Sequence, residues 1–289
     1  MADIFTEFIP QIWSANILDA KDKVHVFGNL ANRNYEGEIT GAGNQVRIPQ
    51  VGDITVNDYT RNNFGTGLTI ENPSAASLFL SIDQQKYFTV GIDKLDMEQS
   101  KPQFMAKISQ KCAYKIADTQ DAFLAGLYAQ AGINSTSNSA STYITLGSSN
   151  VRTELLLMSK AFDAANIQDQ NRWLVAPPAL YFELIDAGIL EQSNNDGVWE
   201  SGKVPNAYGW KIYKSNNVSS PSTDTDQYRI ICGVGTESIT FAEQIVDLQM
   251  INIAQSLKGF GTAIAGLHVY GGRIIPDRTG VIYAKIQNS

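Results

Sequence analysis

The residues that could carry out acid–base, nucleophilic or metal chemistry are few and widely separated. The chain of 289 residues has two histidines, His25 and His268, and two cysteines, Cys112 and Cys232. Neither cysteine belongs to a C-x-x-C motif, and no cysteine or second histidine lies near either histidine, so the spacing of a zinc site is missing. We expect both cysteines to act as small hydrophobic core residues and expect no bound metal.

The short motifs of catalysis and phosphate binding are missing as well. The sequence contains no G-x-S-x-G turn and no G-x-x-x-x-G-K-[ST] loop. The G-x-G pairs that begin at Gly65, Gly233 and Gly259 lack the third glycine of a dinucleotide-binding loop. We therefore expect neither a catalytic residue nor a cofactor. An enzyme whose site is assembled from distant carboxylates or His268 stays open as an alternative.

The composition describes a folded chain with an acidic and sparsely charged surface. Hydrophobic residues make up 43% of the chain, charged residues make up 18%, and the net charge is −7. This balance argues against a basic surface that neutralises phosphates. The first twenty residues contain Asp3, Glu7 and Asp19 but no Lys or Arg, and no long apolar run follows. Neither a secretory signal nor a transmembrane helix is therefore expected.

Two segments near the N-terminus carry more apolar surface than they can bury alone. The first segment, at the N-terminus, has large apolar residues at mostly helical spacings. Either the chain's own core or a neighbouring copy could cover these residues. In the second, residues 36–92, period-two patterns on both sides of a stretch rich in Gly and Asn (62–74) predict a long β-hairpin with an extended tip. A two-stranded ribbon is marginal in water, so we expect it to lie on another surface.

The strongest helix prediction covers about thirty residues before Gly132. Ser100 and Pro102 suit a helix start, and the carboxylates of Asp93, Asp96 and Glu98 precede it, where they complement the positive helix end. Such a helix would be about 45 Å long. Its apolar stripe is broken only at Gln120 and comprises Met105, Ile108, Cys112, Ile116, Phe123 and Leu127.

The second half of the chain predicts a compact α/β region and then a series of strands. Helices are expected at 151–165, with Asn150 as its cap, and after Pro177-Pro178. Strands are expected at 143–146, 173–176, 210–213, 228–232, 238–241, 246–252, 263–273 and 280–286. The fold class is therefore α+β.

The order of these elements, together with several local stretches, resembles the major capsid proteins of tailed bacteriophages, the Hong Kong 97-type shell fold. The stretches are FIPQIWSANIL (8–18), NRNYEGEI (32–39), GNQVRIPQVGDITVNDYT (43–60), SIDQQKYFTVGIDKLD (81–96) and GLHVYGGRII (266–275). The resemblance covers essentially the whole chain.

The resemblance implies an N-terminal arm (1–30), an extended loop with its base (31–92), and a spine helix with part of a peripheral domain (93–149). It further implies an axial domain (150–252) and closing strands of the peripheral domain (253–289). Subunits would form pentamers and hexamers of an icosahedral shell around double-stranded DNA, as part of the virion. The candidate contacts between subunits are Phe8, Ile12, Trp13, Arg47, Tyr59, Arg61 and Phe64.

Further partners follow from the same resemblance. Some relatives cross-link their shells through a lysine of the extended loop, but residues 37–85 contain only Arg47 and Arg61 as basic residues, so we expect no such bond. Some relatives carry a long N-terminal scaffolding segment, whereas this arm begins at Met1, which implies a separate scaffolding protein. A portal and a decoration protein are further expected partners. An acidic wall should hold DNA without binding it tightly.

Three other functions remain open. An encapsulin-like compartment shares this fold and encloses proteins instead of DNA. A phage tail or surface-layer component would form tubes or flat lattices. An enzyme would remain a small oligomer in solution.

Overall fold

The computed structural model describes residues 26–35, 45–51, 54–59, 61, 70–72, 75–94, 103–130, 133–134, 144–147, 149–187, 206–218, 220, 227–252, 260–275 and 282–288. Strands occur in consecutive runs, three before the long helix and six at the end of the described chain, instead of alternating regularly with helices, as is typical of an α+β fold. No helix of these residues is both long enough and apolar enough to cross a membrane.

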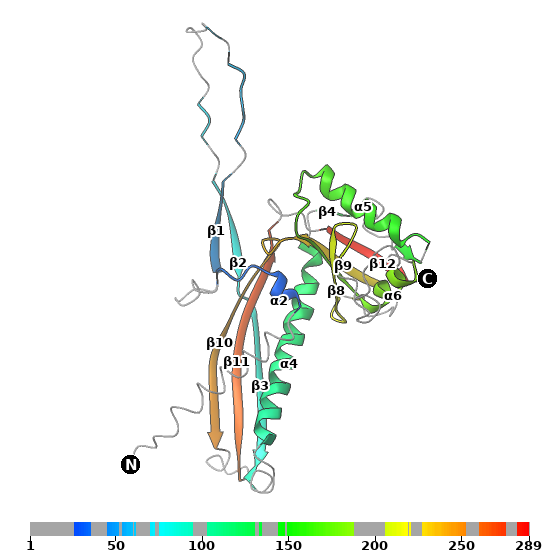
Figure 1. Cartoon of the computed structure of the whole chain (residues 1–289). Coiled ribbons are helices and arrows are strands. Elements are labelled where there is room, and N and C mark those ends of the chain that lie inside the picture. Colours follow the sequence, from blue (N-terminus) through cyan, green and yellow to red (C-terminus); the bar gives the residue numbers. More distant parts are fainter. Residues whose placement is uncertain are drawn as a thin grey trace.

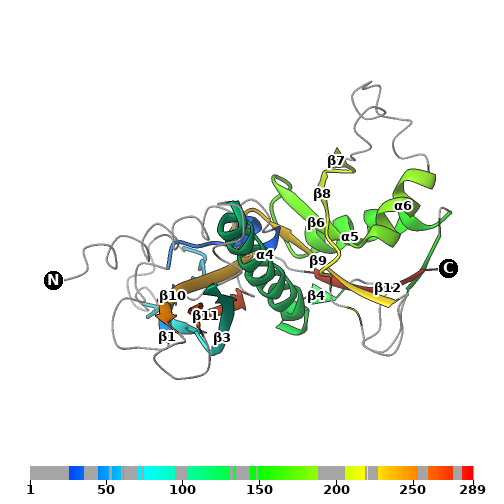
Figure 2. The same cartoon turned by 90° about the horizontal axis from the view of Figure 1, so that it is seen from below.

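A long helix and a three-stranded sheet form the elongated part of the molecule (Figure 1). The sheet has the order β10(Ile239–Asn252), β11(Gly261–Ile274) and β3(Gln84–Asp93), and both pairings are antiparallel. Helix α4(Gln103–Gly126) runs along one face of this sheet, as the end-on view in Figure 2 shows. Phe123 of α4 packs edge-on against Tyr270 of β11, with ring centroids 5.3 Å apart, so the helix and the sheet share an aromatic contact.

Helix α4 differs from its prediction in length and in its buried face. It has 24 residues before a 3₁₀ turn, η2(Leu127–Gln130), which gives about 36 Å instead of about 45 Å. Its fully buried positions include Ala113, Ala117 and Gln120, whereas Cys112 and Ile116 are only half buried. Alanines carry little hydrophobic signal, so the sequence pattern missed the face on which they allow close packing. The part of the chain that the structure describes does not include Asp96, Glu98, Ser100 or the side chain of Met105.

The compact part of the molecule is a mixed sheet covered by two helices. Its strands follow the order β4(Ile133–Asn134), β12(Ile282–Asn288), β9(Gln227–Val234), β6(Arg172–Ala176), β8(Trp210–Lys214) and β7(Asn206–Ala207), and β5(Ile144–Leu146) also pairs with β12. Helices α5(Val151–Ala164) and α6(Pro178–Asp186) are where the sequence predicts them. Asn150 precedes α5, but its side chain accepts a hydrogen bond from the N–H of Gly147, at 2.9 Å, and bonds no N–H of the helix.

The main core joins both parts. It buries Trp173, Trp210, Phe162 and Phe241 almost completely, and it includes Phe27 of the short helix α2(Phe27–Leu30). The Trp210 indole donates a hydrogen bond to the Ser159 hydroxyl, at 2.9 Å, as a buried indole N–H requires. The same core extends along η2 to the long strands, so the two sheets are held as one body.

Sheet membership divides the chain differently from the expected domains. The resemblance placed residues 150–252 in one axial domain. Strand β10 belongs to that range, but it pairs with β11 beside α4. The resemblance assigned strand β12 to the closing strands of the peripheral domain, but this strand pairs with β9 in the compact sheet. The sequence predicted β10 as two pieces, because its register shifts between Ile245 and Asp247, which is a β-bulge that interrupts the alternation. The domain boundaries themselves stay a prediction.

Candidate assembly surfaces

The predicted hairpin is a two-stranded ribbon that projects from the molecule (Figure 1). Strands β1(Gln45–Val51) and β2(Ala75–Ser81) pair antiparallel from Gln45↔Ser81 to Val51↔Ala75 and pair with no other described strand. Among the ribbon side chains that the structure describes, the buried ones lie at its base, where Val46, Ile48 and Leu80 pack with Ala242 and Ile275. Strand β3 leaves the ribbon after Ile82 and joins the three-stranded sheet, so the returning strand is shorter than predicted.

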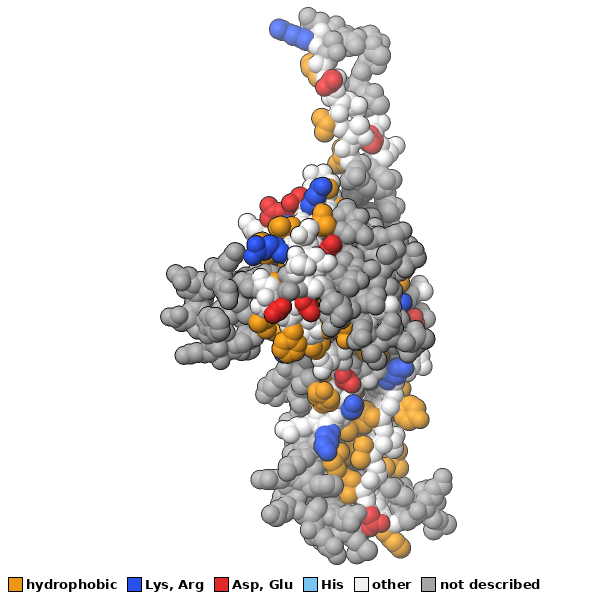
Figure 3. Space-filling view, turned by 90° about the vertical axis from the view of Figure 1, so that its right-hand side faces the viewer, with side chains coloured by type: hydrophobic (Ala, Val, Ile, Leu, Met, Phe, Trp, Pro, Cys, Tyr) orange, Lys and Arg blue, Asp and Glu red, His pale blue; other side chains and the backbone are white. Residues whose placement is uncertain are grey.

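Beyond the paired strands, apolar side chains are exposed on both sides of the hairpin. The exposed fraction is 72% for Ile54, 95% for Val56, 73% for Tyr59 and 88% for Ile70. The two sides are linked by Glu71, whose carboxylate accepts hydrogen bonds from the N–H and the hydroxyl of Thr55, at 2.9 and 3.1 Å. Figure 3 shows this region as a narrow projection with hydrophobic side chains on its surface. We call Ile54, Val56, Tyr59 and Ile70 the hairpin patch.

The candidate contact residues fall into three groups. Tyr59 belongs to the hairpin patch, and Arg61 lies farther along the same extended segment and is exposed. Arg47 is exposed on β1, but its guanidinium donates a hydrogen bond to the Ser77 hydroxyl, at 2.6 Å, across the ribbon. The others lie outside the described residues: Phe8, Ile12, Trp13 and Phe64. Contacts of all seven with another subunit stay a prediction.

A buried polar cluster between α4 and the long sheet was missed by the sequence reasoning. The Glu243 carboxylate on β10 accepts hydrogen bonds from Arg33 and from Gln120, and it lies 3.1 Å from Nε2 of His268 on β11. The side chains of Glu243 and His268 are 5% and 3% exposed. The break in the apolar stripe at Gln120 was the one available signal, because a polar residue in that position faces the sheet. The cluster holds four parts of the chain together: the segment that follows α2, helix α4, strand β10 and strand β11.

Asp121, also on α4, holds the start of the described chain. Its carboxylate oxygens accept hydrogen bonds from the N–H groups of Val26 and Phe27, each at 3.2 Å. Burial raises the pKa of Asp121 to about 6, and the two backbone hydrogen bonds oppose this rise. The described chain therefore begins against α4.

The candidate metal ligands and cysteines of the described residues are not gathered into one cluster. The described residues contain no group of three His, Cys, Asp or Glu side chains that could hold a metal ion. Cys232 is fully buried and Cys112 is partly buried, and burial raises the pKa of both thiols. A thiol with a raised pKa is a poor nucleophile.

Comparisons with known proteins agree with this structure. A family model described as "Phage capsid protein" matches residues 79–284, and a search of curated proteins finds no match. A solved structure from Mycobacterium phage Che8 has 25% sequence identity and a TM-score of 0.71, and the match covers 90% of each chain. The capsid of cyanophage P-SCSP1u has 19% identity and a TM-score of 0.68, with 92% of this chain and 89% of that chain covered. A virus-like particle from Pyrococcus furiosus has 13% identity and a TM-score of 0.57, with 98% of this chain and 100% of that chain covered.

These matches decide between the functions that the sequence left open. The family match extends over the long helix, both sheets and most of the compact part. The likeness to the Pyrococcus furiosus particle shows the shared fold alone, so it does not favour an encapsulin-like compartment. The chain belongs to the phage capsid protein family and is a subunit of a capsid shell with the Hong Kong 97-type fold.

Proposed function

We propose that this subunit closes into rings of five and six copies that build an icosahedral head around double-stranded DNA. The observation that carries the proposal is the hairpin patch, which is exposed on a ribbon whose strands pair with no other described strand. Such a ribbon gains stability when it is laid on another surface. If the hairpin patch covers a different surface of the neighbouring subunit, the contact is heterologous, and a heterologous contact that closes generates rings.

The compact part offers a second set of contacts for the same rings. Its surface carries Leu156 on α5, Phe182 on α6 and Tyr213 on β8, with exposed fractions of 48%, 63% and 38%. Large apolar side chains on this scale are favourable in an interface and costly in water. We assign them to contacts between neighbouring subunits around the ring axis.

The net charge of −7 fits a wall that encloses DNA. DNA carries about one negative charge per 1.7 Å of its axis, so a wall without a strong positive charge holds it without tight binding. The proposal includes assembly in the host cytoplasm with a separate scaffolding protein and a portal, and a decoration protein on the finished shell. The subunit's role in this assembly is structural, and we assign it no reaction.

Electron microscopy of the purified full-length chain tests the proposal. We expect closed shells from the unmodified chain, and small oligomers without closed shells from Val56→Asp, because this substitution places a carboxylate in the hairpin patch. Asn57→Asp is the matched control, since it adds the same charge to the next exposed position, and it should still form shells.

Other particle forms would contradict the proposal. An unmodified chain that stays a small oligomer would indicate an enzyme, and tubes or flat lattices would indicate a tail or surface-layer component. Closed particles that contain protein cargo instead of DNA when isolated from infected cells would indicate a compartment. Equal assembly by Val56→Asp would remove the hairpin patch from the mechanism.

A further inference from the structure

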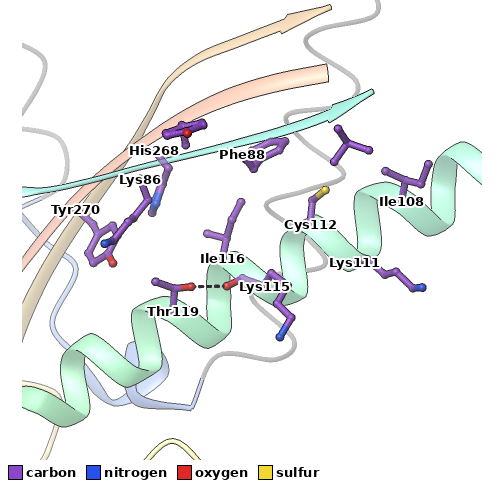
Figure 4. Close-up of a pocket in the computed structure, with 12 residues that line it drawn as sticks. Lys86, Phe88, Ile108, Lys111, Cys112, Lys115, Ile116, Thr119, His268 and Tyr270 are labelled. Atoms are coloured by element: carbon purple, nitrogen blue, oxygen red, sulfur yellow. Dashed lines mark hydrogen bonds between the residues drawn. The ribbon is translucent and has the colours of Figure 1, made fainter. Parts of the chain in front are cut away.

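An apolar groove runs between α4 and the inner face of the long sheet. Its volume is about 470 Å³. Figure 4 shows Phe88 on one wall and Ile108, Cys112 and Ile116 on the other, with their side chains directed into the space between helix and sheet. Phe88, Cys112 and Ile116 are only half buried in the subunit, so a ligand that fills the groove would bury more apolar surface.

The rim of this groove is basic. Lys86 from β3 and Lys111 and Lys115 from α4 line it, and its lining contains no Asp or Glu among the described residues. Lys115 also lies 3.6 Å from Asp118, but its side chain is 75% exposed, so this ion pair contributes little. Three lysines at one apolar groove contrast with the net charge of the chain, which is −7. Figure 3 shows hydrophobic side chains together with basic ones on the lower part of the molecule.

One segment of this chain has the complementary chemistry. The first twenty residues contain three carboxylates, Asp3, Glu7 and Asp19, and no Lys or Arg. They are also rich in large apolar residues, among them Phe5, Phe8, Ile9, Ile12, Trp13 and Ile17. Complementary charge on the two surfaces selects the correct partner, and apolar contact supplies affinity.

We propose that the groove between α4 and β3 binds residues 3–19 of a neighbouring subunit. Asp121 holds the N–H groups of Val26 and Phe27 on α4, and it follows Cys112 by nine positions, which places it about 180° around the helix from the groove. The described part of the subunit's own chain therefore begins on the side of α4 that faces away from the groove. The inference rests on the proposed function, because only an assembled particle brings a second copy to the groove.

Site-specific photo-cross-linking in assembled full-length particles tests this inference. A benzophenone amino acid replaces Phe8, particles are confirmed by electron microscopy, and the irradiated sample is separated on a denaturing gel and digested for mass spectrometry. We expect a band of two subunits that contains position 8 bonded to a peptide from residues 86–90 or 108–119. The same photo-reactive residue at Val56 in the hairpin is the comparison and should label other peptides.

Charge variants show whether the lysines select the segment. Lys111→Glu with Lys115→Glu should lower the cross-link yield by about tenfold or more, because like charges then face each other. Lys160→Glu, on the exposed side of α5, is the control and should leave the yield unchanged. Adding Glu7→Lys and Asp19→Lys to the lysine double variant should restore the cross-link yield. If the lysine double variant does not assemble, the same addition should restore closed particles.

Four results would overturn the inference while particles still form, and so leave the proposed function standing. Two of them concern position 8: a cross-link within one subunit, or a cross-link only to peptides outside the groove. The third is labelling of the groove from position 56. The fourth is a cross-link yield that the lysine double variant leaves unchanged. Absence of closed particles from the unmodified chain would instead overturn the proposed function.

Discussion

At the scale of single residues, polar side chains in buried positions hold the chain in place. Arg172 is 6% exposed at the start of β6 and donates hydrogen bonds to the carboxylates of Asp163 and Asp169, at 2.6 and 2.7 Å. It also donates to the backbone oxygens of Ile167 and Gln168, at 3.0 and 3.1 Å. One guanidinium therefore closes the connection between α5 and β6, which matches its fixed fork of donors.

Asp121 predicts a specific dependence of stability on pH. Its pKa is about 6 in the folded subunit against an ordinary value of 3.8, so the folded state binds this proton more tightly than the unfolded state does. The stability that this proton contributes is complete below pH 3.8 and is lost as the pH rises through about 6. Asp121→Asn cannot titrate, so its free energy of unfolding should rise relative to wild type between about pH 4 and pH 7.

Urea unfolding of unassembled subunits at several pH values measures this difference. Asp186→Asn, at an exposed position of α6, is the control and should follow wild type at every pH. Parallel stability curves for wild type and Asp121→Asn would contradict the raised pKa.

At the scale of elements, the ribbon and the long sheet meet where a side chain would not fit. A Cβ atom on Gly271 of β11 would lie 2.1 Å from the backbone oxygen of Ser81, at the end of β2. Near this close approach of β11 to β2, the Arg273 guanidinium donates a hydrogen bond to the backbone oxygen of Phe79, at 2.8 Å. The direction in which the hairpin leaves the body therefore depends on this close approach.

Gly271→Ala should displace β2 and destabilise the subunit. The added methyl group meets backbone atoms that cannot rotate away, and overpacking of this kind costs about 1–3 kcal/mol or more. Gly126→Ala is a control of opposite sign, because its Cβ would have no neighbour within 4 Å and alanine is favoured over glycine in a helix by about 1 kcal/mol.

Denaturant unfolding measures both effects, and the yield of closed shells shows whether the hairpin is still directed correctly. Wild-type stability in Gly271→Ala would show that β2 adjusts without cost.

The sequence predicted local elements better than it predicted their contacts. Apolar spacing located α5, the Pro177-Pro178 pair located the start of α6, and β-branched and aromatic content located β6, β11 and both pieces of β10. It could not locate the close approach at Gly271 or the polar cluster around Glu243, since these depend on residues far apart in the sequence. It also could not tell that β3 leaves the hairpin, because β2 and β3 continue the same alternation and differ only in their partners.

At the scale of the whole molecule, a framework of long elements carries surfaces that the described residues of the subunit leave uncovered. Strands β10 and β11 have 14 residues each and extend for about 46 Å beside α4. The ribbon projects from one end of this framework, and the compact part lies beside the C-terminal end of α4 (Figure 1). A single subunit thus exposes the hairpin patch and the basic groove, which are contacts for other copies in the proposed shell.

This arrangement predicts a shell without covalent bonds between subunits. Residues 37–85 contain no lysine for an isopeptide bond, and burial raises the pKa of both Cys112 and Cys232, which suppresses disulfide exchange. Several interfaces of standard size, each burying about 800 Å² per partner, would give cooperative closure without such bonds. Mature shells heated in denaturant without a reducing agent should therefore give a single band at the mass of one subunit. A ladder of multimers on that gel would show that a covalent bond forms between subunits, and mass spectrometry of the ladder would identify the residues that form it.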